Sequence, residues 1–339
     1  MVNKIFSKLK EFFIEEWKFL IILFITFIIC TYPVDYYIIT GGGIISATDR
    51  VEVVGAKKKK GSFSLTYVAE LRGTIGTYLL SYIIPSFEKE SIEEYTYNDK
   101  EDTNDIDYRN TLLLNNANNS AIYVAYTTAG KKIEEVNNGL YIYYIDKKAE
   151  TDLKIGDKVL EIDGNKLETF DEVKEYISSC ETGKKITITT LYKDKKKKRT
   201  AKVYEEEGKK YIGVAFISDI SYKTTPKVKI NFKDSEGGPS GGLMMTLEIY
   251  SQLVNKDITK GNKIAGTGTI DTDGNVGEID GIKYKLRGAV KNKCTIFIAP
   301  TGRNYKEAVK EKKKHNYSIK IIEAKTFEQV LEELKKNII

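Results

Sequence analysis

An uninterrupted apolar run near the start of the chain constrains its structure more than any other feature. Residues 19–30 read FLIILFITFIIC, and the apolar stretch extends from Trp17 to Val34. Its 18 residues reach the lower end of the length, about 17–25 residues, that a helix needs to span a bilayer. No small-residue cleavage site follows, and Phe27–Cys30 makes a poor lipobox, so the pattern favours an uncleaved anchor over a signal peptide. We therefore expect a transmembrane helix over residues 17–34.

The charges around this run predict its orientation. Lysines gather before and at its start: Lys4, Lys8, Lys10 and Lys18. Only Asp35 follows the run closely. Because positive charge collects on the cytoplasmic side, residues 1–16 should lie in the cytoplasm and the remainder outside, in a single-pass protein of the plasma membrane. The alternative is the inverted orientation, in which the remainder faces the cytoplasm.

Composition excludes several kinds of site. Three cysteines, one of them in the apolar run, and a single histidine are too few for a disulfide framework, a zinc site or a His-Asp triad. We expect Cys180 and Cys294 in the core, His315 in solvent, and neither a cofactor nor a metal. The net charge of +6 comes visibly from lysine-rich runs at 57–60 and 195–199, interpreted as solvated loops or hairpins, with attraction to an anionic membrane as the alternative. Without interleaved aromatics or a binding motif, nucleic acid is not an expected partner.

The segment 35–120 mixes short β-type runs with a polar stretch. Residues 62–67 alternate like a strand, whereas residues 77–83 fit either a helix or a buried strand. Residues 88–119, which are rich in Glu, Asp and Asn, are interpreted as a long surface excursion.

Regular patterning begins near residue 121. A helix containing Val124 precedes a β-type run at 139–145, a Gly-Asp turn leads into a strand ending at Gly164, and a helix and a strand follow at 171–178 and 185–192. This order, over residues 121–205, resembles a PDZ domain. The resemblance implies that an extended peptide adds to the sheet edge and that its C-terminus is captured by the N–H groups of one loop. That loop would be Gly139, Leu140, Tyr141 and Ile142; the alternative is a buried strand.

In the last third, a serine is flanked by glycines where a helix should begin. An alternating strand at 227–232 is followed by Glu236-Gly-Gly-Pro-Ser240-Gly-Gly, and a helical stripe starts at Leu243. Ser240 is therefore either an N-cap that satisfies a free amide or a nucleophile. Gly238 and Gly241 favour the second interpretation, because they let a substrate backbone approach the hydroxyl, and the helix start favours an oxyanion.

A base for this serine is sought among the lysines. Residues 263–270 read as a buried strand, 271–275 as a hairpin turn, and another helix begins near Gly281 and carries Lys285 early. The helix dipole and burial would both lower the pKa of that lysine toward the neutral amine that a general base requires. Lys283 is the rival. Since residues two apart on a helix point about 200° apart, only one of them can face Ser240, and we favour Lys285.

These motifs together resemble a known family. Gly-Pro-Ser-Gly-Gly, Gly-Thr-Gly-Thr-Ile, Gly-Asn-Val-Gly and Gly-Ile-Lys-Tyr-Lys occur in this order from Glu236 to about Pro300, as in the proteolytic domain of Lon peptidases. The resemblance implies a Ser240-Lys285 dyad with Thr267 hydrogen-bonding the lysine amine. Two departures stand out: Glu236 lies one residue before the position of the family's Asp, and Gly241 replaces Ala, which we expect to widen the site.

The whole layout resembles the membrane-bound, PDZ-containing Lon-like proteases of Gram-positive bacteria. It implies a multidomain fold: a transmembrane helix, a mostly β PDZ domain with helices, and an α/β Lon-type domain over residues 206–339. The PDZ region either precedes that domain or splits it, since residues 60–82 loosely resemble its early strands and first helix. No GxxxxGK[ST] motif occurs, so no ATPase motor is expected. We expect an ATP-independent serine endopeptidase acting on extracytoplasmic peptides or protein segments; the alternative is a catalytically silent, membrane-tethered PDZ adaptor.

Overall fold

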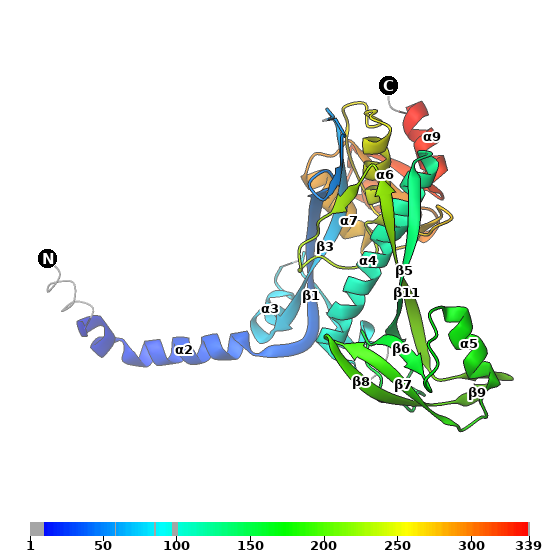
Figure 1. Ribbon diagram of the computed structural model, residues 1–339. Helices are drawn as coiled ribbons and strands as arrows, with labels where there is room; N and C mark the ends of the chain where they lie inside the picture. Colours follow the sequence, from blue (N-terminus) through cyan, green and yellow to red (C-terminus); the bar gives the residue numbers. More distant parts are fainter. Residues whose placement is uncertain (1–9, 58, 85, 97–100, 338–339) are drawn as a thin grey trace. The chain divides into compact units, whose positions relative to one another are not determined.

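The computed structural model describes residues 10–57, 59–84, 86–96 and 101–337. The chain divides into two compact units. The first holds the residues up to Gly41 together with Ala69–Tyr95, and the second holds Gly42–Val68 together with the chain from Thr96 onward. Two long strands, β1 (Pro33–Ser46) and β3 (Ser62–Thr74), run through both units. Figure 1 shows the elements coloured along the chain.

The apolar run forms helix α2 (Trp17–Thr31) in the first unit. The expected end at residue 34 is wrong: Tyr32 is already extended, because a proline disfavours helical geometry in the residue before it, and Pro33 begins β1. The 15-residue helix leaves its large apolar side chains exposed, Phe19, Phe24 and Phe27 among them. Within the described ranges, no helix combines the length and the apolarity that crossing a membrane requires.

Helix α3 (Ile75–Leu80) resolves the ambiguity over residues 77–83 in favour of a helix. A reciprocal capping box starts it: the Thr77 N–H donates to Thr74 Oγ1 over 3.3 Å, and the Thr74 N–H donates to Thr77 Oγ1 over 2.8 Å. Strand β4 (Glu88–Ser91), antiparallel to β1, and the 3-10 turn η1 (Ile92–Glu94) complete this unit.

The main sheet of the second unit joins strands that are far apart in the sequence. β3 pairs in parallel with β13 (Lys263–Gly266), with Phe63 opposite Ile264. β16 (Ile296–Pro300) and β17 (Lys320–Ala324) extend the sheet in parallel, and β1 lies on the other side of β3. The PDZ-like region therefore lies, in sequence, between two sets of strands that form one sheet.

Helices cover both faces of this sheet, as the alternation of side chains along its strands requires. Ile296 and Ile298 face a core shared with α6 (Gly242–Leu253) and α9 (Phe327–Asn337). Phe297 and Ala299 face the opposite core, shared with α7 (Ile282–Lys291) and α8 (Arg303–Lys314). The result is a layered α/β architecture.

Helix α4 (Thr103–Thr128) overturns the interpretation of residues 88–119 as a surface excursion. Asp102 and Asp105 form a capping box at its start, and one side of the helix is buried, including Leu114, Ala117 and Val124. The helix is polar overall, so packing against α6, β5 and β11 stabilises it more than its composition does. Figure 1 shows α4 running alongside the long strands β5 and β11.

A second sheet is antiparallel, in the order β11-β5-β6-β7-β8. Helix α5 (Phe170–Ser179) packs on it and shares a separate core that includes Leu140 and Val173. Lys195 to Lys198, from one lysine-rich run, are exposed on the β7–β8 hairpin. The strands are β5 (Lys132–Ile145), β6 (Lys158–Ile162), β7 (Lys185–Tyr192), β8 (Lys195–Lys202) and β11 (Val214–Thr225).

Short antiparallel pairs complete the second unit. The strand expected over 227–232 is shorter than predicted, and the one expected over 263–270 divides into β13 and β14, with the predicted turn after β14. The pairs are β2 (Val51–Val53) with β12 (Val228–Ile230), β9 (Tyr204–Glu206) with β10 (Lys209–Tyr211), and β14 (Thr269–Ile270) with β15 (Val276–Gly277).

Candidate active site

Ser240 ends the loop that follows β12 and lies just before helix α6. The N-cap of α6 is Gly241 and its first helical residue is Gly242, so Ser240 is not the cap. Its side chain is half-buried. The main-chain N–H groups of Ser240 and Gly241 have no hydrogen-bond partner among the described residues, and the helix N-terminus adds a partial positive charge. The serine hydroxyl therefore lies beside two N–H groups that are available to an anion.

Lys285 projects from the first turns of α7 and is buried, at 5% exposure. The N-cap of this helix is Gly281, whose φ of 72° favours glycine. A Cβ at this position would also lie 2.8 Å from Val68 Cγ2, on β3. Glycine therefore lets α7 begin close against β3, and this sets the position of Lys285.

Thr267 connects the lysine to the serine. Lys285 Nζ donates to Thr267 Oγ1 over 3.4 Å, and Thr267 Oγ1 donates to the main-chain carbonyl of Ser240 over 2.9 Å. The Gly268 N–H donates to the same carbonyl over 2.8 Å. Thr267 is fully buried. The structure thus brings together the three residues that the motifs singled out.

Lys283 lies elsewhere on α7. Its side chain is half-buried, and its Nζ lies 4.8 Å from the centroid of the Tyr284 ring. Because it precedes Lys285 by two residues, it points about 200° away around the helix. Lys285, and not Lys283, contacts Thr267.

A cleft of about 640 Å³ opens at Ser240. Its glycine-rich side is formed by Gly237, Gly238 and Gly241, next to the serine. Lys285 and Thr267 are not among the residues that line it, so they lie behind Ser240. The apolar walls include Ile44, Leu65, Val68, Leu114 and Phe232. The charged side chains are Asp49, Arg50, Lys233 and Glu236.

Glu236 is held by a residue that sequence reasoning missed. Arg50 Nε donates to Glu236 Oε2 over 3.1 Å, and Arg50 Nη2 donates to Oε1 over 2.5 Å. Burial works to raise the pKa of Glu236, but the hydrogen bonds from Arg50 and from the Lys233 N–H outweigh it, so the pKa lies below its usual range. Nothing in the local sequence marks Arg50, since its partner is 186 positions away.

Gly241 does not widen the site, contrary to expectation. A Cβ at this position would lie 2.1 Å from Leu65 Cδ2, which is closer than packed atoms approach. Leu65, on β3, occupies the space that an alanine methyl would need. Glycine at position 241 and leucine at position 65 therefore fit together, because the leucine side chain fills the space that the alanine methyl group of the family pattern would take.

The residues proposed as a peptide-binding loop, Gly139 to Ile142, lie inside strand β5. Leu140 pairs with Ser218 of β11 on one side and with Val159 of β6 on the other, so the backbone there is not a free edge. The outermost strands are β11 and β8. Phe216 of β11 packs on the core of this sheet, with its ring centroid 6.4 Å from that of Phe170 on α5. The sheet edge beside α5 therefore belongs to β11.

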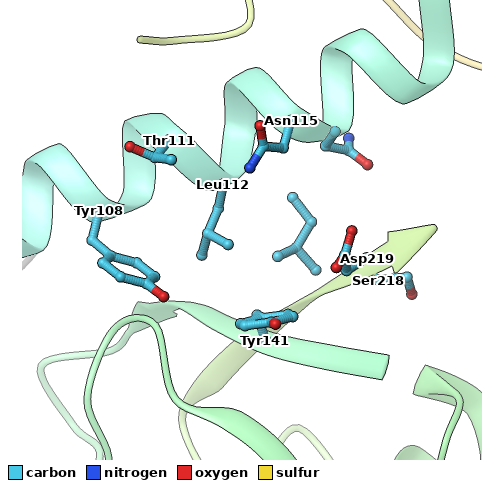
Figure 2. A pocket seen from close by; sticks show the side chains of 9 residues that line it. Tyr108, Thr111, Leu112, Asn115, Tyr141, Ser218 and Asp219 are labelled. Atoms are coloured by element: carbon cyan, nitrogen blue, oxygen red, sulfur yellow. The ribbon is translucent and has the colours of Figure 1, made fainter. Parts of the chain in front are cut away.

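A second cavity, of about 200 Å³, lies between α4 and the strands β5 and β11. Figure 2 shows Tyr108, Leu112 and Asn115 projecting from the helix toward Tyr141 and Asp219 on the strands. Burial, with the nearby Asp219 charge adding to it, raises the pKa of Tyr141. Its hydroxyl is therefore neutral at physiological pH. Both hydrogen-bonding groups and apolar side chains line the cavity.

Among the described residues, no three His, Cys, Asp or Glu side chains are grouped as metal ligands. Cys30, Cys180 and Cys294 are free thiols, and burial raises the pKa of Cys294. His315 pairs with Glu311 one turn earlier on α8, at 3.2 Å.

Two family models match the chain. The first, PDZ domain, matches residues 128–203. The second, Lon protease (S16) C-terminal proteolytic domain, matches residues 227–336, a range that contains Ser240, Thr267 and Lys285. The chain therefore carries a PDZ domain and a serine-peptidase domain of the Lon type.

The solved structures that are similar to this chain include PDZ domains. The PDZ domains of SdrC-like proteins from Listeria monocytogenes and Listeria innocua are 26% and 24% identical, cover 24% and 23% of this chain and 90% and 93% of their own, and give TM-scores of 0.22. A solution structure of GtR34C from Geobacillus thermodenitrificans is 18% identical and covers 23% of this chain and 94% of its own, with a TM-score of 0.21. No curated protein matches the chain.

Proposed function

We propose that this protein is an ATP-independent serine endopeptidase in which Ser240 is the nucleophile and Lys285 the general base. One observation carries the proposal: a buried lysine donates to Thr267, which in turn donates to the main-chain carbonyl of a serine that lines a cleft. Burial disfavours the ammonium form of a lysine, which suits a base. The Lon-type family match supports the same reaction class.

In the proposed reaction, the neutral Lys285 amine takes the proton of Ser240 as Oγ attacks the scissile carbonyl carbon. The carbonyl oxygen becomes an oxyanion, and the N–H groups of Ser240 and Gly241 stabilise it, together with the start of α6. The Lys285 ammonium then protonates the leaving amine, and the C–N bond breaks. The product is an ester between Ser240 and the acyl part of the substrate.

Deacylation repeats these roles with water. Lys285 takes a proton from a water molecule, whose oxygen attacks the ester carbonyl. The proton returns to Ser240 Oγ as the ester bond breaks, which releases the new carboxyl terminus. Thr267 orients the amine throughout, because its hydroxyl is itself fixed by the Ser240 carbonyl.

Substrates are proposed to be exposed peptides, tails or loops. The sequence has no GxxxxGK[ST] motif, so the proposal includes no ATPase motor of that type within this sequence. The PDZ domain is proposed to bind such segments by strand addition at the β11 edge, beside α5. The place of β11 at the end of its sheet supports this position over residues 139–142, which are paired on both sides.

The location is a separate proposal. The lysines before the apolar run support a cytoplasmic N-terminus and an extracytoplasmic catalytic domain at the plasma membrane. The exposed apolar side chains of α2 support contact with lipid. Reporter fusions at the C-terminus test the orientation: activity of a reporter that works only in the cytoplasm would contradict it.

The activity itself is tested with the full chain purified in detergent, with casein and a quenched-fluorescence peptide mixture as substrates and with or without ATP. We expect cleavage by the wild type that is independent of ATP and is lost in Ser240→Ala. Full activity in Ser240→Ala would contradict the mechanism. Absence of cleavage by the wild type would favour the silent PDZ adaptor.

A further inference from the structure

The loop between β12 and Ser240 is held by few hydrogen bonds within the loop itself. Between β12 and Ser240 the chain is irregular, and Gly237, Gly238 and Pro239 directly precede the serine. The main-chain bonds that hold this loop from outside include the Asn231 N–H to the Arg50 carbonyl, at 2.9 Å, the Gly238 N–H to the Asn110 carbonyl, at 3.0 Å, and the Gly268 N–H to the Ser240 carbonyl, at 2.8 Å. Two adjacent glycines leave the backbone between Glu236 and Pro239 with wide conformational freedom. A side-chain contact at Glu236 would restrain the start of this segment.

The Glu236 side chain supplies that contact. Both of its oxygens accept from the Arg50 guanidinium, at 3.1 and 2.5 Å, and Oε2 also accepts from the Lys233 N–H at 3.0 Å. The Arg50 and Glu236 side chains are only 15% and 14% exposed. A two-pronged, charge-assisted pair that is largely removed from water is stronger and more directional than a surface pair.

Arg50 is itself rigidly placed. It ends the turn between β1 and β2, where its N–H donates to the Ala47 carbonyl over 3.0 Å and its carbonyl accepts from Asn231. The guanidinium therefore connects the wall of the cleft to the residue four positions before the nucleophile. Fixing Glu236 therefore fixes the start of the short segment that leads to the serine.

We propose that Arg50 and Glu236 are positioning residues, which hold the Gly237–Ser240 loop so that the serine hydroxyl stays within reach of Lys285. This inference rests on the proposed peptidase function and deepens it. Glu236 lies outside the proposed dyad, and its role would be to keep Ser240 in position. Its partner, Arg50, comes from a part of the chain that is distant in sequence. Neither residue contacts the reacting atoms.

The test compares Glu236→Gln and Arg50→Lys with the wild type in the full chain. Glutamine has the shape of glutamate but not its charge. Lysine has the charge of arginine but not its planar guanidinium, which forms two parallel hydrogen bonds to a carboxylate. We expect kcat to fall about 10- to 100-fold, since small displacements of reacting groups cost factors of this size, with KM changed less than about threefold. Glu134→Gln, which neutralises an exposed pair with Lys223, is the matched control and should leave kcat unchanged.

A second readout separates positioning from substrate binding. A small fluorophosphonate phosphonylates Ser240 Oγ, with loss of fluoride, without occupying the rest of the cleft, so its rate of reaction should fall in parallel with kcat. Amide hydrogen exchange over residues 233–243 should quicken in Glu236→Gln, with the melting temperature within a few degrees of the wild type. If one variant does not fold, the other and the exchange measurement still decide.

The outcomes are distinct. Unchanged kcat and unchanged exchange in both variants would overturn the proposal, and so would an effect on KM alone, which would make Arg50 a substrate contact. If the wild type neither cleaves peptides nor reacts with fluorophosphonate, but exchange quickens in Glu236→Gln, the result supports the role of Glu236 in holding the loop and contradicts the proposed peptidase function.

Discussion

Thr267 donates its hydroxyl hydrogen to the main-chain carbonyl of Ser240, over 2.9 Å, and so directs its oxygen toward Lys285. The carbonyl has a second donor in the Gly268 N–H, at 2.8 Å. The threonine is therefore not needed to satisfy this carbonyl. Its hydroxyl is better explained as a support for the lysine amine.

Thr267→Val should separate these two roles. Valine has nearly the same shape but cannot accept from Lys285, so we expect kcat to fall about 10- to 100-fold. The free energy of unfolding should change by only about 1 kcal/mol, because the Ser240 carbonyl keeps one donor. Steady-state kinetics and denaturant unfolding measure the two effects. Thr267→Ser keeps the hydroxyl and is the control; a loss as large as that of valine would contradict the role.

The choice of base predicts a contrast between two lysines. Lys285→Met removes the amine but keeps a long apolar side chain, and we expect kcat to fall roughly 100- to 10,000-fold, the usual contribution of a general base. Lys283→Met should stay within about twofold, since Lys283 does not contact Thr267. Peptide cleavage assays at fixed pH distinguish the two. A large loss in Lys283→Met alone would reverse the assignment.

The contact between Gly241 and Leu65 predicts a compensating pair of substitutions. Gly241→Ala places a methyl group where Leu65 Cδ2 lies, so it should destabilise the fold by about 1–3 kcal/mol. Leu65→Ala alone should cost about 2–5 kcal/mol. In the double variant the cost should be clearly less than the sum. Denaturant unfolding of all four proteins gives the coupling energy, and simple additivity would show that the two sites do not interact.

A pH dependence is expected from Asp257, which joins the starts of β3 and β13. Burial works to raise its pKa, but hydrogen bonds from Thr259, from the Gly61 N–H and from the Gly261 N–H outweigh it and lower the pKa. A carboxyl with a depressed pKa stabilises the fold above its unfolded value, about 3.9, and this stabilisation is lost as the pH falls through the folded value.

Asp257→Asn tests this dependence. The difference in unfolding free energy between wild type and variant should be constant above about pH 5 and should shrink below about pH 4. Urea unfolding across this range measures it. A difference that grows on acidification would contradict the assigned direction of the shift.

The residues of the proposed dyad could be singled out because local motifs carry them. Glycines around Ser240 and at Gly281 are required by close approaches and by a left-handed backbone, and such requirements are visible in a short window of sequence. The helix expected at Val124 is the C-terminal part of α4, whereas the polar part of α4, residues 103–119, was not predictable in this way. Its asparagine-rich sequence has weak intrinsic helix preference, and contacts with elements more than 100 positions away stabilise it.

The position of the sheet edge in the PDZ domain and the partner of Arg50 could not be predicted from the sequence either. Whether a strand lies inside a sheet or at its edge depends on partners elsewhere in the chain: β5 is flanked because β11, about 80 residues later, pairs with it. Likewise, the role proposed for Arg50 can be recognised only in the folded chain, where Glu236 lies beside it. Pairings over such separations leave no local pattern, so they appear only in the folded chain.

The pairing of β3 with β13 has a consequence for the time at which the protein becomes active. These strands come from opposite ends of the chain, with Ser62 opposite Lys263, and the cleft walls from β1 and β3 surround a serine that is synthesised much later. A growing chain on the ribosome cannot close this sheet until almost all of it has emerged. The cleft at Ser240 is therefore completed late in synthesis, and under the proposed function a partly synthesised chain has no peptidase activity.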